Sequence, residues 1–93
     1  MKTVVVLIGN SDGKLAQHEW AEFAAEMDKV VDRSATKVHF KGGSAWDAPR
    51  QNACWVAEVP LDRIEGMLTE IAQVRRTWRQ ESAAVLTGDT MFV

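Results

Sequence analysis

The sequence predicts an α+β fold, because its apolar residues recur with two different periods. Four short segments alternate apolar and polar residues or are rich in β-branched ones, as strands are: residues 3–8, 35–40, 53–59 and 82–87. Two longer segments between them repeat apolar residues every three or four positions, as amphipathic helices do. The chain has 93 residues, of which 46% are hydrophobic and 26% charged, so we expect one globular domain.

The first half of the chain predicts a buried strand followed by a helix. The β-branched run at residues 3–8 is typical of a strand that is buried on both faces. Residues 10–13 form a turn, with Ser11 or Asp12 as the N-cap of a helix that starts near Lys14. This helix carries one apolar stripe: Ala16, Trp20, Phe23, Met27 and Val30 or Val31.

The second half repeats this order. The strand at residues 53–59 leads to Pro60, which fits the first turn of a helix because its missing N–H needs no partner there. Acidic residues near the start of this helix and arginines near its end complement the helix dipole. Its apolar stripe is Leu61, Ile64, Leu68, Ile71 and Trp78, flanked by Met67 and Val74. A strand at residues 82–87 and an apolar tail at 91–93 follow.

The resulting order, β-α-β-β-α-β, predicts a ferredoxin-like split βαβ domain over residues 1–93. Two right-handed crossovers in so short a chain place both helices on one face of a four-stranded antiparallel sheet. The strands at 3–8 and 53–59 are expected at the centre of this sheet. The connection at residues 41–51 is longer than the roughly two to five residues of an ordinary hairpin loop.

The face of the sheet without helices is expected to carry apolar groups. In the third strand, alternation puts Cys54 and Val56 on the opposite side from Trp55, and the sequence leaves open which side is buried. Soluble monomers rarely expose a large apolar patch. We therefore expect a homodimer through this face or through an edge strand. The alternative is that the loop and the tail fold over the face.

Composition argues against several classes of function. With 11 basic and 13 acidic residues the net charge is −2, whereas nucleic-acid binders need clustered positive charge. A single cysteine cannot form an intramolecular disulfide, which fits a reducing compartment. No apolar segment approaches the length of a signal sequence or of a membrane helix. We expect a cytoplasmic protein that binds neither membranes nor nucleic acids.

Few residues are candidates for chemistry. His39 and Cys54 are able to face each other on neighbouring strands, but a catalytic thiol also needs a nearby cation or helix N-terminus. Cys54 is therefore predicted to be a small buried hydrophobe. His18 and Glu22 have helical spacing but form no known metal motif. The sequence predicts no catalytic residue, no metal and no cofactor.

Trp46 is the one tryptophan without a predicted role in packing. Trp20 and Trp78 lie on helix stripes and Trp55 lies on a central strand, whereas Trp46 lies in the loop at 41–51. Long loops often carry function, and Trp and Arg are enriched in interface hot spots. We predict a protein-binding surface from this loop: Trp46, Arg50, Lys41 and Asp47. The alternative is that Trp46 folds back over the sheet face or a helix end.

Two segments, DAPRQNACWV at residues 47–56 and RQES at 79–82, resemble small uncharacterised accessory proteins of actinobacterial phages. The resemblance implies a small intracellular phage protein that binds a host or phage protein. It implies no catalytic residues. Our leading hypothesis is accordingly a non-enzymatic interaction module that uses the loop at 41–51, the open sheet face or both.

Two alternative functions remain open. The architecture looks like that of dimeric α+β barrel proteins, which implies a small-molecule binder or cofactor-independent enzyme with His39, Cys54 and Trp55 lining its site. Residues 12–16, DGKLA, resemble the strand-to-helix turn of ACT domains, which implies an amino-acid ligand at residues 10–13. RNA-recognition motifs share the element order, but the first strand lacks the aromatic residue that stacks on bases.

Overall fold

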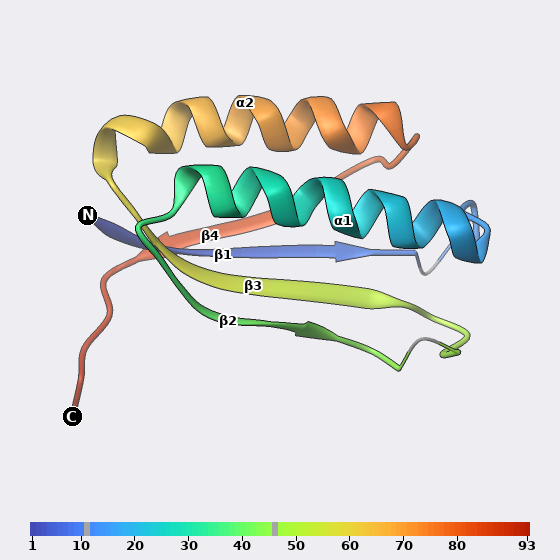
Figure 1. Ribbon diagram of the computed structural model, residues 1–93, viewed down its shortest axis with the longest axis horizontal. Helices are drawn as coiled ribbons and strands as arrows, with labels where there is room; N and C mark the ends of the chain where they lie inside the picture. Colours follow the sequence, from blue (N-terminus) through green and yellow to red (C-terminus); the bar gives the residue numbers. More distant parts are fainter. Residues whose placement is uncertain (11, 46) are drawn as a thin grey trace.

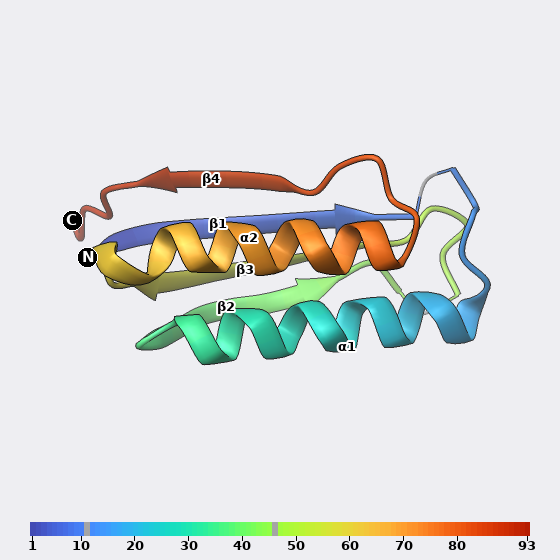
Figure 2. The ribbon, with the colours of Figure 1, turned by 90° about the horizontal axis from the view of Figure 1, so that it is seen from above.

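A computed structural model describes residues 1–10, 12–45 and 47–93 and has the predicted order of elements. These are β1 (Lys2–Gly9), α1 (Gln17–Ser34), β2 (Lys37–Gly43), β3 (Asn52–Val59), α2 (Leu61–Thr77) and β4 (Ala84–Gly88). The strands form one antiparallel sheet in the order β2-β3-β1-β4 (Figure 1). Both helices lie side by side on one face of it (Figure 2). The ferredoxin-like arrangement, with β1 and β3 at the centre, is confirmed.

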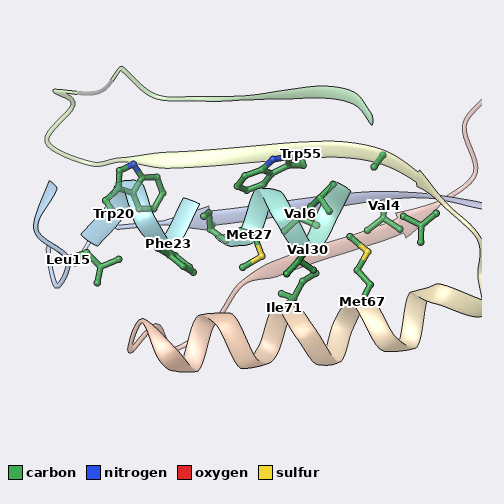
Figure 3. Close-up of a cluster of buried hydrophobic side chains, with 14 residues drawn as sticks. Val4, Val6, Leu15, Trp20, Phe23, Met27, Val30, Trp55, Met67 and Ile71 are labelled. Atoms are coloured by element: carbon green, nitrogen blue, oxygen red, sulfur yellow. The ribbon is translucent and has the colours of Figure 1, made fainter. Parts of the chain in front are cut away.

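The core lies between the sheet and the two helices. The inward side chains of the central strands are buried: Val4, Val6, Ile8, Trp55, Ala57 and Val59. The helices meet them with Trp20, Phe23, Met27, Val30, Val31, Met67 and Ile71 (Figure 3). The side of β3 that carries Trp55 therefore faces the helices, which decides the alternative that the sequence leaves open.

Helix α1 begins at Gln17 rather than near Lys14, because Asn10 holds the preceding segment in place. The side-chain oxygen of Asn10 accepts the backbone N–H of Leu15 at 3.0 Å, and its amide donates to the Leu15 carbonyl at 2.9 Å. Both residues are buried. This paired contact fixes Leu15 in the core outside the helix.

The N-cap of α1 is Ala16, so the prediction of Asp12 or Ser11 is wrong. An alanine side chain cannot accept a hydrogen bond, and Glu19 supplies the missing polar contact. Its carboxylate accepts the backbone N–H of Ala16 at 3.1 Å. This bond is the largest cause of the lowered pKa of Glu19, because it favours the charged carboxylate. Ser11 lies outside the described residues.

Helix α2 buries a stripe rotated from the predicted one. Met67 and Ile71 are buried, whereas Leu61 and Leu68 are 63% and 41% exposed. The helix packs against α1 on one flank as well as on the sheet below, and this double contact selects the side that carries Met67. The sequence has apolar residues on both sides of this stripe, so periodicity alone does not choose between them.

Trp78 is the C-cap of α2, directly after its last helical residue, and its half-buried side chain packs against the core, as the predicted stripe implies. Arg79 adopts a positive φ of 59°, and the N–H of Gln80 donates to the Arg75 carbonyl at 2.9 Å. This is the geometry of a Schellman helix end. The indole N–H of Trp78 donates to the Glu26 carboxylate on α1 at 2.8 Å, so it ties the end of α2 to α1.

Strand β2 extends to Gly43, so the loop covers residues 44–51 instead of the predicted 41–51. Gly42 pairs with Cys54 in the sheet. A Cβ at Gly43 would collide with the carbonyl oxygen of Asn52 on β3. Gly43 therefore permits close contact between the strands, and both glycines belong to β2 rather than to the loop.

Candidate functional site

The sheet face away from the helices, which we call the open face, carries an apolar row across all four strands. In the strand pairing, Val5 lies between Val56 of β3 and Leu86 of β4. Val56 in turn pairs with Phe40 of β2. Phe40 and Leu86 are 55% and 60% exposed, and the two valines are half-buried. This apolar row, Phe40–Val56–Val5–Leu86, is continuous and most exposed at its two ends.

A second row on the open face lies beside the first. It consists of Gly42, Cys54, Leu7 and Ala84, one from each strand. A Cβ at Gly42 would lie 2.8 Å from the Phe40 ring, so this ring covers the Gly42 backbone. Leu7 is 39% exposed and Cys54 is half-buried. The two rows together form one apolar patch.

A β-bulge turns Phe40 to the open face. Val38 pairs with Ala57 and Phe40 pairs with Val56, so β2 advances two residues while β3 advances one. Val38 packs against the core. In a regular strand Phe40 would point to the core side as well, whereas the extra residue, His39, shifts it to the open face.

A polar cluster around Glu58 borders the apolar row. The Glu58 Oε1 atom accepts hydrogen bonds from Thr3 Oγ1 at 2.9 Å, His39 Nε2 at 3.1 Å and Thr90 Oγ1 at 3.4 Å. The hydroxyls of Thr3 and Thr90 also contact each other. Hydrogen bonds from Thr3 and then His39 lower the pKa of Glu58. The carboxylate is thus satisfied within its own chain.

Trp55 and Lys41 lie on the opposite side of the sheet from this patch. The Trp55 indole N–H donates to Asp28 of α1 at 2.8 Å, and the Lys41 ammonium lies 3.3 Å from the same carboxylate. With Ala24 and Ala25 these residues line an open groove of about 350 Å³. The polar groups of the groove are engaged with one another.

The three residues predicted to line a ligand site do not come together. His39 and Cys54 lie on the open face and Trp55 lies in the core, so the sheet separates them. Cys54 pairs with Gly42, and His39 contacts Glu58 instead. Within residues 1–10, 12–45 and 47–93, no three His, Cys, Asp or Glu side chains are grouped to hold a metal ion.

The turn compared with ACT domains has a structural role in this chain. The side chain of Asn10 is fully engaged with the backbone of Leu15. The cavity beside the turn, of about 270 Å³, is lined by the acidic Asp12 and Glu81. These two side chains would repel the carboxylate of an amino acid and attract its ammonium group, so their charge does not by itself favour this ligand.

The residues of the predicted loop surface are spread over different environments. Asp47 and Arg50 are exposed in the loop. Lys41 belongs to β2 and reaches α1, so it does not join them. Trp46 lies outside the described residues.

The sequence alone does not identify four residues of the open face: Glu58, Thr3, Phe40 and Leu86. Glu58 had a detectable signal, because it interrupts the apolar run of β3 at the same parity as Cys54. The other three depend on strand register. The exposed row becomes visible only when residues from four distant segments are aligned.

Comparison with protein-family models finds no match to this chain, and comparison with curated proteins likewise finds none. Of the two helices in the described part of the chain, neither is long and apolar enough to cross a membrane. A functional proposal for this chain therefore starts from the geometry of the open face.

Proposed function

We propose that this chain is a non-enzymatic, cytoplasmic protein-interaction module that binds a partner protein through the open face of its sheet. The observation that carries the proposal is the apolar row Phe40–Val56–Val5–Leu86, which is exposed at both ends. Protein interfaces have a centre that is poor in charge and rich in aromatic and aliphatic side chains, with a polar rim. The open face has this composition, and the Glu58 cluster forms part of its rim.

Covering the row is favourable in free energy. Full burial of a Phe or Leu side chain contributes about 1.5–3 kcal/mol. Phe40 and Leu86 keep more than half of their surface exposed, so a partner that covers them gains about 1 kcal/mol from each. The half-buried Val5 and Val56 add to this gain. Glu58 does not oppose it, because its carboxylate already has hydrogen-bond donors in its own chain.

The polar cluster supports a binding role more than a catalytic one. His39 and Glu58 form a pair of the kind that orients a general base. A groove beside this cluster is lined by Thr3, Leu86 and Thr90, among others, and has a volume of about 190 Å³. Ligand sites are usually larger, roughly 300–1,000 Å³, and enclosed by the protein.

The loop at residues 44–51 is proposed as a second contact region. Asp47 and Arg50 are exposed charged groups there. Rim charges of this kind steer association and select partners. The resemblance of residues 47–56 to phage accessory proteins supports a partner of host or phage origin.

Affinity capture from a lysate of the organism that makes this protein tests the proposal. Three tagged baits are compared: the wild-type chain, Leu86→Glu on the open face, and Leu61→Glu on α2. The two leucines are 60% and 63% exposed, so neither substitution removes core packing. We expect a partner that wild type and Leu61→Glu retain and that Leu86→Glu loses by about tenfold or more.

Recovery of the untagged chain itself is also measured, because it is one of the proteins that the bait is able to capture. If Leu86→Glu and Leu61→Glu recover every protein equally, including the untagged chain, the open face is not a binding surface. An Arg50→Ala bait tests the loop in the same experiment. Equal recovery of every partner by this bait would exclude Arg50 as a contact.

A further inference from the structure

We infer that the partner on the open face is a second copy of this chain, bound face to face in a homodimer. The inference rests on the proposed function, because it identifies the occupant of the same surface. The two sheets would form the inner layers of the dimer and the helices the outer ones. Three properties of the open face point to this occupant.

The first property is its size. The strands are five to eight residues long. Four of them, about 4.8 Å apart with about 3.3 Å per residue, project an area of roughly 440 Å². This projection is about half of the ~800 Å² that each partner buries in a standard interface, and the relief of the side chains adds accessible area to it.

The apolar tail adds to this area. Met91 and Phe92 are each 85% exposed. The tail leaves β4 on the side of the sheet away from the helices (Figure 1). It therefore extends toward the space that a second copy would occupy, and its side chains would be covered there.

The second property is charge. Two residues at open-face positions of the described strands carry a formal charge, Lys37 and Glu58. Their signs are opposite, and they are register partners on neighbouring strands. The face therefore carries no net formal charge, so two copies are not repelled by an excess of one sign. A buried unpaired charge would be costly. The hydrogen bonds that Thr3 and His39 donate to Glu58 reduce that cost at the rim.

The third property is the symmetry of the apolar row. Phe40 and Leu86 stand at its ends, with Val56 and Val5 between them. A two-fold axis along the strands, between β1 and β3, would set Phe40 of one copy against Leu86 of the other. Both exposed ends are then covered in both copies at once. Two-fold contacts of a surface with its own copy are the commonest oligomer interfaces.

Sedimentation equilibrium of the full chain tests the inference. We expect wild type and Leu61→Glu to have twice the 10.4 kDa mass of one chain at concentrations on the order of 10 µM. Leu86→Glu is expected to raise the dissociation constant by about tenfold or more. Circular dichroism and thermal unfolding show whether each variant is folded.

Cys54 provides a second measurement that needs no variant. It is the only cysteine of the chain, and it lies half-buried on the open face opposite Leu7. In a face-to-face dimer its reaction with a thiol reagent slows as the wild-type concentration rises. We expect a decrease of about tenfold across the dimerisation range, and no such dependence in Leu86→Glu.

Three results would overturn the second copy as the partner. The first is a monomeric wild type at concentrations up to about 100 µM, with Cys54 reactivity independent of concentration. The second is a dimer in which Cys54 stays as reactive as in the monomer. The third is a dimer that Leu61→Glu breaks and Leu86→Glu leaves intact. In each case, affinity capture distinguishes failure of the homodimer from failure of the proposed function. If the Leu86→Glu bait loses a different protein that wild type binds, the open face is still a binding surface.

Discussion

The indole N–H of Trp55 on β3 donates to the carboxylate of Asp28 on α1 at 2.8 Å. A buried indole N–H requires such an acceptor, since tryptophan otherwise leaves an unsatisfied donor in the core. Lys41 of the edge strand β2 reaches the same carboxylate at 3.3 Å. Asp28 thus connects one helix to two strands.

Replacement of Asp28 should therefore destabilise the fold. We expect Asp28→Ala to lower the free energy of unfolding by about 1–3 kcal/mol, because it leaves the Trp55 donor without its acceptor. Asp28→Asn keeps an acceptor oxygen and should cost less. Asp32→Ala, at an exposed position one turn further along α1, should change stability by no more than about 0.5 kcal/mol. Urea unfolding measures all three, and equal losses for Asp28→Ala and Asp32→Ala would contradict this role.

Glu58 should make stability depend on pH in the acidic range. Its pKa is lower in the folded than in the unfolded chain, because Thr3 and His39 donate to its carboxylate. The stabilisation is therefore present at neutral pH and is lost as the pH falls below about 4.5 toward the folded pKa. Glu58→Gln should give a shallower decrease in the free energy of unfolding between about pH 5 and 3.

The control for this experiment is Glu65→Gln, at an exposed position on α2. The pKa values of Glu19 and Asp89 are also lowered, mainly by the Ala16 N–H and by Lys2 respectively. Both groups are present in every variant, so the quantity compared is the slope of the free energy of unfolding against pH. A Glu58→Gln slope identical to that of wild type would show that the cluster does not favour the charged form.

Asn10 should be among the least replaceable polar residues. Its buried side chain makes two hydrogen bonds to the Leu15 backbone, and Asn10→Ala removes both. We expect a loss of about 2 kcal/mol in the free energy of unfolding, because two backbone groups lose their partners in a buried site. Asn52→Ala, at an exposed position, serves as the matched control. A similar small loss in both variants would refute an anchoring role for Asn10.

The two glycines of β2 should respond differently to alanine. At Gly43 a Cβ would meet the Asn52 carbonyl of the neighbouring strand, so the strands must separate. At Gly42 it would meet the end of the Phe40 ring, which is able to swing aside. We expect Gly43→Ala to cost about 1–3 kcal/mol and Gly42→Ala less than half of that. Thermal unfolding ranks the two variants, and the reverse ranking would contradict the strand contact.

The candidate site was only partly predictable from the sequence. Alternation in β1 sends Val5 and Leu7 to one side and predicts that the open face is apolar. The exposed ends of the row, Phe40 and Leu86, come from the two edge strands, and their positions depend on pairing with distant segments. The loop prediction centred on Trp46 stays a prediction, because this residue lies outside the described part of the chain.

The sequence by itself determined the order of the elements, the layering of the sheet and helices, and the central place of β1 and β3. The order follows from the periods of apolar residues within each segment, which are a local property. The layering and the central strands follow from the right-handed crossovers that this order implies. Only the tertiary structure decided that Trp55 faces the helices, that Asn10 holds Leu15 outside α1, and that the bulge at His39 turns Phe40 to the open face. The orientation of Trp55 and the bulge depend on pairing between segments far apart in the chain, where a shift of one residue in register moves a side chain to the other face. The contact of Asn10 with Leu15 spans only five residues, but both side chains are buried, and their burial depends on the rest of the core.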